Sequence, residues 1–213
     1  MRTIDIESWS RRDHYHWMKG WEYPHFSMCA NIDLTNFYPY IKKMGISINI
    51  AIVYVVARAA NAVPEFRTRM RRDEVVEHET VHPSTTILTD DDLFTFCPVE
   101  YTEDFQEFSA RAKQQIDLVK AQVVLTDEPG TDHWLFMTAI PWVSFTAFMH
   151  PLRLSPADSV PRFAWGKIVQ KGVSVEMPLS VQGHHALMDG FHIGKFYKIA
   201  QEIFDNPKFF RSI

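Results

Sequence analysis

Hydrophobic residues recur along this chain with two spacings, one helical and one of alternating residues. Apolar residues at every third or fourth position predict amphipathic helices over residues 8–19, 35–44, 48–63, 104–123 and 191–204. Alternation, with many β-branched and aromatic side chains, predicts strands over residues 26–34, 75–81, 84–88, 93–96, 134–148 and 173–185. Helices and strands are mixed without a strict order, so the pattern predicts an α/β or α+β sandwich without a glycine-rich nucleotide-binding signature.

The ends of some elements carry their own signals. Ser8 and Ser47 stand where the side chain of a helix N-cap would accept a backbone hydrogen bond. Pro64 cannot continue the helix that starts at Ile48, so that helix is expected to end before it.

Composition narrows the class of protein. A chain of 213 residues, 46% hydrophobic and without linkers or repeats, is expected to form one domain over residues 1–213. The net charge of −4 argues against a nucleic-acid or membrane partner, because either would favour a basic surface. The longest apolar run, residues 48–60, contains Asn49 and Arg58 and is too short to span a bilayer. Without a signal-peptide pattern, and with only Cys29 and Cys97, the expected location is the reducing cytoplasm.

The last predicted strand ends in the segment Gly183–His192, which reads GHHALMDGFH. Alternation along the strand puts His185 on the same face as the apolar residues and His184 on the polar face. Burial on the apolar face would keep the His185 imidazole neutral. Such a histidine is either a hydrogen-bonded core residue or a general base ready to take a proton, and the segment alone leaves both open.

The other polar residues of the segment have simpler explanations as well. Adjacent histidines on a strand point to opposite faces, and no cysteine or glutamate spacing completes a ligand set, so no metal is expected. Asp189 and Gly190 suit a turn in which Asp189 caps the final helix. The capping interpretation needs no chemistry and stands beside a functional role for the carboxylate.

Together with four other blocks, this segment resembles the chloramphenicol acetyltransferase family. The pattern His-x-x-x-Asp-Gly alone also occurs in dihydrolipoyl acyltransferase cores and in peptide-synthetase condensation domains. The five blocks together are specific, and the similarity runs from about residue 4 to residue 207. The blocks are Trp9–His14, Asn61–Arg67, Thr80–Pro83, Pro141–Thr146 and Gly183–His192.

The resemblance implies a fold and a reaction. Family members are homotrimers of a two-layer α/β sandwich, a mixed β-sheet with helices on one side, and each active site lies at a subunit interface. They transfer acetyl from acetyl-CoA directly to a hydroxyl of chloramphenicol. Residue matching makes His185 the general base and pairs Asp189 with Arg11, which keeps the site in shape. Lys167 matches a lysine that contacts CoA, and Phe26 matches an aromatic residue of the acceptor pocket.

Two positions depart from the family pattern. A serine that donates to the oxyanion of the tetrahedral intermediate is Ala147 here, and a threonine that binds the intermediate through water is Ala164. If residues 134–148 form one strand, Ser144 and Thr146 face away from Ala147 and do not replace it. The expected function is O-acetyl transfer to chloramphenicol or a related small alcohol. The alternatives are a non-catalytic or weakly active ligand-binding homologue and a dihydrolipoyl-type acyltransferase.

Overall fold

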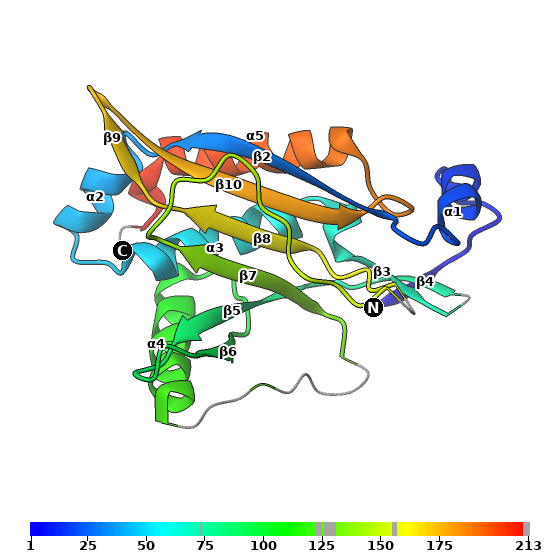
Figure 1. Cartoon of the computed structure of the whole chain (residues 1–213), viewed down its shortest axis with the longest axis horizontal. Helices are drawn as coiled ribbons and strands as arrows, with labels where there is room; N and C mark the ends of the chain where they lie inside the picture. The colour runs from blue at the N-terminus through cyan, green and yellow to red at the C-terminus, as the bar shows by residue number, and fades with distance from the viewer. Residues whose placement is uncertain (73, 122–124, 126–130, 155–156, 211–213) are drawn as a thin grey trace.

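The computed structural model describes residues 1–72, 74–121, 125, 131–154 and 157–210, and in this part of the chain it contains a large and a small β-sheet (Figure 1). Strands of the large sheet follow the order β2-β10-β8-β7-β5-β6, and β9 pairs with the start of β10. The sheet is mixed, because β7 runs parallel to both of its neighbours and the other pairs are antiparallel. Its strands are β2 (His25–Asp33), β5 (His82–Leu88), β6 (Phe94–Pro98), β7 (Trp134–Ile140), β8 (Arg162–Gly166), β9 (Val169–Lys171) and β10 (Ser174–His184).

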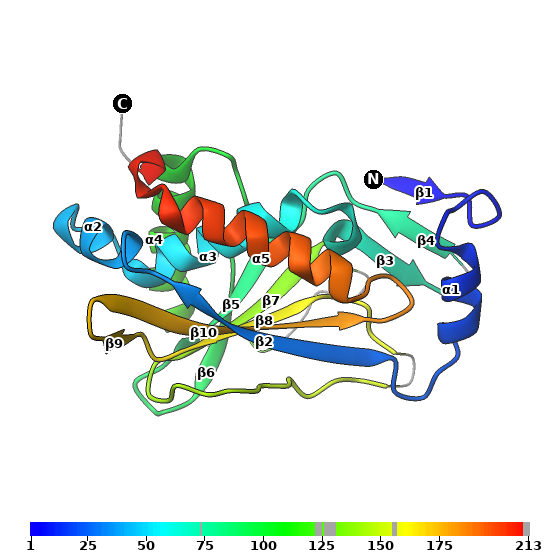
Figure 2. The same cartoon turned by 90° about the horizontal axis from the view of Figure 1, so that it is seen from above.

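The small sheet has the order β1-β4-β3 and lies at the end of the molecule where β10 finishes (Figure 2). It comprises β1 (Arg2–Ile4), β3 (Thr68–Arg71) and β4 (Glu74–Glu77). Helix α1 (Arg12–Met18) packs Tyr15 and Met18 against this sheet and against Ala186 and Leu187, which follow β10. This packing holds the N-terminal part of the chain beside the end of β10.

Helices cover one face of the large sheet, and the other face has no helix over it in the described part of the chain (Figure 2). The helices are α2 (Phe37–Lys43), α3 (Ile48–Asn61), α4 (Phe105–Ala121) and α5 (Gly190–Asp205), with the 3₁₀ helices η1 (Pro64–Arg67) and η2 (Pro207–Phe210). Extended chain after β7, residues 141–151, crosses the second face, which we call the open face. The architecture is the predicted two-layer sandwich.

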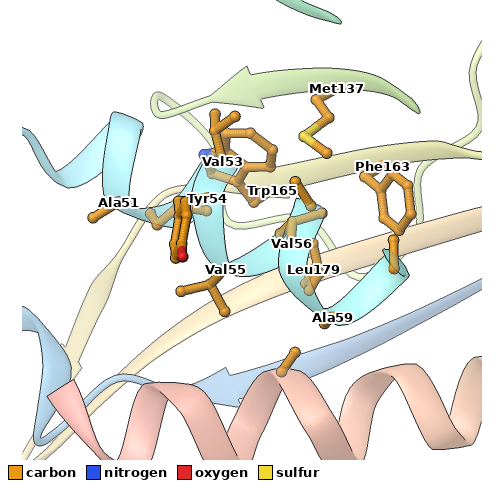
Figure 3. Packing of buried hydrophobic residues seen from close by; sticks show 14 of the residues in the cluster. Ala51, Val53, Tyr54, Val55, Val56, Ala59, Met137, Phe163, Trp165 and Leu179 are labelled. Atoms are coloured by element: carbon orange, nitrogen blue, oxygen red, sulfur yellow. The ribbon is translucent and has the colours of Figure 1, made fainter. Parts of the chain in front are cut away.

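Helix α3 is buried on nearly every side because the sheet lies against one of its faces and α5 against another (Figure 3). Val53 and Val56 lie beside the sheet residues Met137, Phe163 and Trp165 in the same core cluster. The helix begins as predicted, since the Ser47 hydroxyl accepts a hydrogen bond from the Ile50 amide. It ends at Asn61, before Pro64.

One predicted cap is wrong. Helix α1 begins at Arg12 rather than after Ser8, and the Ser8 hydroxyl instead donates to the Asp5 carboxylate at 2.8 Å. Arg11 precedes the helix and its side chain reaches the turn after β10. The N-terminal end of α1 therefore has no side-chain cap at Arg11. The Arg11 side chain instead makes long-range hydrogen bonds to the turn after β10.

Two strand predictions also need correction. The strand predicted over residues 134–148 ends at Ile140, because Pro141 has no amide hydrogen for a ladder bond and the chain turns there. The meander predicted over residues 75–96 is divided, since β4 joins the small sheet while β5 and β6 belong to the large one. The pattern does not predict β8, because its five residues are all buried and no apolar–polar alternation marks it.

Candidate active site

His185 stands directly after the last residue of β10, where the strand enters a turn. Its amide donates to the carbonyl of Pro24 at 2.7 Å, and its ring Nδ1 lies 3.1 Å from the carbonyl oxygen of Met188. Because a carbonyl only accepts, Nδ1 carries the hydrogen and Nε2 of the neutral ring keeps its lone pair. The turn therefore fixes the tautomer that a general base requires.

Aromatic side chains flank this imidazole. The Phe26 ring of β2 lies 4.8 Å from the His185 ring between centroids, and the Trp21 ring approaches edge-on at 6.5 Å. Phe26 stands opposite Gly183 in the pairing of β2 with β10, which explains why it reaches the residue two positions further along. The ring of His185 is half-buried and lies between apolar surfaces.

Gly183 is needed for the turn to fold back in this way. A Cβ atom at residue 183 would lie 2.3 Å from the sulfur of Met188, far inside van der Waals contact. Met188 is fully buried, and its carbonyl is the one that orients His185. A side chain at Gly183 would thus displace the residue on which the imidazole depends.

The guanidinium of Arg11 joins three points of the turn. Nη1 donates to Asp189 Oδ2 at 2.8 Å, Nε to the carbonyl of Ala186 at 3.0 Å, and Nη2 to the carbonyl of His185 at 2.9 Å. The Arg11 side chain is 10% exposed and that of Asp189 is 34% exposed. Partial burial raises the pKa of Asp189, but the Arg11 hydrogen bond and nearby His192 outweigh it and hold the pKa below its usual value.

The Asp189 carboxylate caps α5 as well as pairing with Arg11. Asp189 is the N-cap of α5, since Oδ1 accepts from the amide of Phe191 at 3.0 Å. His192 completes a capping box, because its Nδ1 accepts from the Asp189 amide at 3.1 Å. His192 Nε2 lies 3.3 Å from Glu65. Asp189 therefore ties α5 to the turn, and Arg11 ties the turn to the N-terminal segment.

The burial of the two adjacent histidines is the reverse of the predicted one. His184 is 1% exposed, and its Nδ1 accepts from the Ala186 amide at 3.2 Å. Desolvation, with His25 nearby, lowers the pKa of His184 to about 4. Its face of β10 is polar, as alternation predicts, but tertiary neighbours cover it, among them the His25 ring of β2 at 5.0 Å between ring centroids. His185 lies beyond the strand and keeps more exposure.

The remaining predicted site residues lie far from His185 in the same chain. Ala164 is buried on β8 opposite Ser180, about 17 Å along β10 from His185 at 3.3–3.4 Å per residue. Lys167 is exposed just beyond β8, about 27 Å away on the same scale. Ala147 is exposed and precedes Phe148, whose carbonyl accepts from the Ser180 hydroxyl at 3.0 Å. The structure therefore brings Arg11, Asp189 and Phe26 to His185, but not these three residues.

The prediction that Ser144 and Thr146 face away from Ala147 on one strand is wrong. Residues 141–150 are not a strand, so alternation does not assign them to faces. Ser144, Thr146 and Ala147 are all exposed to solvent. Gly166 allows this segment to pass closely over β8, since a Cβ there would lie 2.6 Å from the Val143 carbonyl oxygen.

A cavity of about 450 Å³ lies on the open face between β5, β6, β7 and the segment that crosses them. Its wall is mainly aromatic and aliphatic, which is typical of sites for small organic ligands. Sequence reasoning missed it, although the alternate residues Ser84, Thr86 and Leu88 of β5 could have indicated part of its lining. The side chains that define it include Ser84, Thr86, Phe94, Phe96, Phe136, Thr138, Trp142, Phe148, His150 and Arg162.

A half-buried histidine with a fixed tautomer at a strand end, on a two-layer sandwich that also carries a ligand-sized cavity, fits the acyltransferase class. The chloramphenicol acetyltransferase family model matches residues 1–201. A chloramphenicol acetyltransferase from Klebsiella is 32% identical over 206 residues, covering 95% of this chain and 93% of the relative. One from Clostridium perfringens is 31% identical over 95% of this chain and 94% of its own. The chain belongs to the chloramphenicol acetyltransferase family.

Solved structures agree with this assignment. A chloramphenicol acetyltransferase structure superposes with a TM-score of 0.84 at 25% identity, covering 95% of this chain and 99% of the other. A probable dihydrolipoamide acetyltransferase from Listeria monocytogenes has a TM-score of 0.69 at 16% identity, covering 97% and 95%. The second likeness shows a common fold alone.

Within the part of the chain that the structure describes, no three or more His, Cys, Asp or Glu side chains are grouped to hold a metal ion. Among the same residues, no helix has both the length and the apolar character needed to cross a membrane.

Proposed function

We propose that the chain transfers acetyl from acetyl-CoA to a hydroxyl of chloramphenicol or a related small alcohol. Family membership supports the reaction class, and relatives over nearly the whole chain carry the name of this activity. The observation that carries the proposal is the hydrogen bond of His185 Nδ1 to the Met188 carbonyl, because it leaves Nε2 free to accept a proton.

The proposed reaction follows from that lone pair. His185 Nε2 takes the proton of the acceptor hydroxyl while the oxygen attacks the thioester carbonyl of acetyl-CoA. The tetrahedral intermediate then collapses, the C–S bond breaks, and the imidazolium returns its proton to the departing thiolate. The Met188 carbonyl stabilises the imidazolium through Nδ1. Arg11 and Asp189 act as positioning residues, because they hold the turn and do not themselves face the reacting atoms.

We further propose a homotrimer in which each site is completed between two copies. Ala147 and Lys167 stand about 17–27 Å from His185 along the strands of one chain, too far to act on one thioester. Pairing His185 of one copy with the cavity, Ala147 and Lys167 of the next would remove that separation. Lys167 would then contact CoA, and Phe26 would line the acceptor site. Large apolar side chains exposed around both parts favour an interface: Trp17, Tyr23, Met28, Trp142 and Met149.

Ala147 also favours a second candidate, a weakly active or non-catalytic homologue that binds the acceptor. Losing one oxyanion donor costs about 10²–10³ in kcat in a comparable site. Ala164 removes a further hydroxyl relative to the family pattern. If the family oxyanion geometry applies, chloramphenicol is a slow substrate or another alcohol is preferred.

Release of the CoA thiol, measured over a panel of hydroxylated acceptors, tests the proposal. We expect release with at least one small alcohol and loss of release in His185→Ala. Acceptor binding by a folded protein without any thiol release across the panel would instead favour the ligand-binding homologue.

A further inference from the structure

His184, the last residue of β10, accepts hydrogen bonds from three successive amides of the turn that follows His185. Its carbonyl accepts from the amides of Leu187 and Met188 at 2.9 and 3.1 Å. Its ring Nδ1 accepts from the amide of Ala186 at 3.2 Å. Ala186 is fully buried, so without the ring its amide has no solvent to bind. The side chain of His184 therefore helps to hold the backbone of this turn.

The same turn carries the groups that orient the proposed base. The Met188 carbonyl lies 3.1 Å from Nδ1 of His185. The Ala186 carbonyl accepts from Nε of Arg11 at 3.0 Å. A shift of the turn backbone would therefore move the carbonyl that fixes the His185 tautomer. The ring of His184 is connected to His185 through this backbone and does not itself face the reacting atoms.

Only the neutral ring of His184 can hold the turn in this way. A protonated imidazole carries a hydrogen on both nitrogens, so Nδ1 would meet the Ala186 amide donor to donor. Burial, reinforced by nearby His25, lowers the pKa of His184 to about 4, so the ring is neutral near pH 7. Its Nε2 is buried and has no hydrogen-bond partner among the described residues, so no carboxylate there stabilises the charged form.

The charged and titratable groups around this ring come from β2, from β8 with the segment before it, and from the turn. The His25 ring of β2 lies 5.0 Å away between centroids, and its Nε2 is hydrogen bonded to the Asp158 carbonyl. The Asp158 carboxylate pairs with Arg162 of β8, and His185 follows His184 directly. Desolvation, which outweighs the bond to Asp158, lowers the pKa of His25. Both imidazoles are therefore neutral near pH 7.

We propose that His184 is a positioning residue for His185, because its neutral ring holds the Ala186 amide and so fixes the turn beside the base. The inference rests on the proposed function, in which His185 takes the proton of the acceptor hydroxyl. Protonation of His184 releases the Ala186 amide. Activity should therefore fall in acid for a reason separate from protonation of the base itself.

Two substitutions separate the acceptor atom from the bulk of the ring. His184→Asn places an amide oxygen close to the position of Nδ1, where it can accept from Ala186, whereas His184→Leu keeps bulk without an acceptor. We expect kcat within about 3-fold of wild type for His184→Asn and a loss of about 10-fold or more for His184→Leu, because misplacing a catalytic group by about 1 Å can cost 10²-fold. KM should change little, since the ring does not contact substrate. Equal losses in both variants would overturn the inference, as would kcat near wild type in His184→Leu.

His82→Leu is the matched control. Nδ1 of His82 also accepts from a backbone amide, that of Tyr101 at 2.9 Å, and burial lowers its pKa. Its strand, β5, is separated from β10 by β7 and β8 in the sheet. His82→Leu should therefore lower the melting temperature, as His184→Leu does, and leave kcat unchanged. An equal fall of kcat in the two Leu variants would point to general destabilisation and contradict a positioning role.

The pH profile gives a readout that needs only wild type and His184→Asn. The amide does not titrate, so wild-type kcat should fall more steeply than that of His184→Asn as the pH decreases towards 4. Stability follows the same sign. The pKa of His184 is lowered from 6.5 to about 4 in the folded protein, so the unfolded chain binds more protons within this window. Wild type should therefore lose more of its melting temperature there, and parallel profiles would overturn the inference even if His184→Leu does not fold.

The tautomer of His185, measured from the nitrogen NMR shifts of its imidazole, tests positioning without turnover. We expect the Nδ1–H form in wild type and in His184→Asn, and a mixture of tautomers in His184→Leu. A mixture in His184→Leu with no release of CoA thiol by wild type leaves the inference standing and contradicts the proposed function. Thiol release by wild type with an unchanged tautomer in His184→Leu supports the function and overturns the inference.

Discussion

The two adjacent histidines, His184 and His185, differ in their hydrogen bonds and in their burial. His185 has an Nδ1 hydrogen bond and partial exposure, whereas His184 is buried and its pKa is lowered to about 4. His185→Ala should therefore lower kcat by about 10²–10⁴-fold and leave the melting temperature nearly unchanged. His184→Ala should lower the melting temperature, because it opens a cavity in a covered part of the sheet. Steady-state kinetics and thermal denaturation of both variants make the comparison, and His185→Ala activity within a few-fold of wild type would contradict its role as base.

Ala147 is the residue at which a single added atom should improve catalysis. Its side chain is exposed, so Ala147→Ser should fold without strain. A hydroxyl that bonds only to the developing oxyanion raises kcat and leaves KM nearly unchanged. We expect a gain of about 10-fold or more with chloramphenicol, below the 10²–10³ of a complete site because Ala164 still lacks a hydroxyl. An unchanged or lower kcat in the folded variant would indicate that another group, such as the nearby Thr146 hydroxyl, already serves the oxyanion.

At the scale of elements, the site depends on the turn between β10 and α5. Arg11 bonds to both the backbone and the Asp189 carboxylate, so the start of α1, the turn and the α5 cap form one unit. Arg11→Ala and Asp189→Asn should each lower both the melting temperature and kcat. The double variant should lose less than the sum of the two.

The coupling energy should be about 1–2 kcal/mol, below the 3–5 kcal/mol of a fully buried pair, because Asp189 is 34% exposed. A double-mutant cycle by chemical denaturation measures this coupling. Strictly additive losses would mean that each residue acts through its backbone contacts alone.

The sequence predicted elements well where local chemistry determines them. Ser47 before an apolar helix and Pro64 after it mark α3 on both sides, and the alternation in β10 separates its core residues from its polar ones. Prediction from the sequence failed where tertiary contacts determine which residues form a strand or are buried. Buried β8 has no alternation, and the burial of His184 depends on tertiary neighbours such as His25, which local pattern does not reveal. The cavity was missed because its lining comes from strands far apart in the sequence.

At the scale of the whole molecule, the two parts of the proposed site lie on different regions of one surface. His185 directly follows β10, whose end lies near α1 (Figure 2). The cavity and Ala147 lie over the open face of the sheet. A chain that acts alone would need to move these parts by many ångströms through a packed sheet. A second copy can supply the missing half without any such change, so the arrangement of the chain favours shared sites.

Mixing two inactive variants tests shared sites directly. His185→Ala removes the base, and Ala147→Trp fills the other half of the site at an exposed position that should tolerate it. In cyclic trimers formed at random from equal amounts of both, roughly a quarter of all sites combine two intact halves, so activity should return to about a quarter of wild type. The two chains are co-expressed, and thiol release is compared with each variant alone. If every site were built within one chain, each would contain a damaged half, and the mixture would stay as inactive as its components.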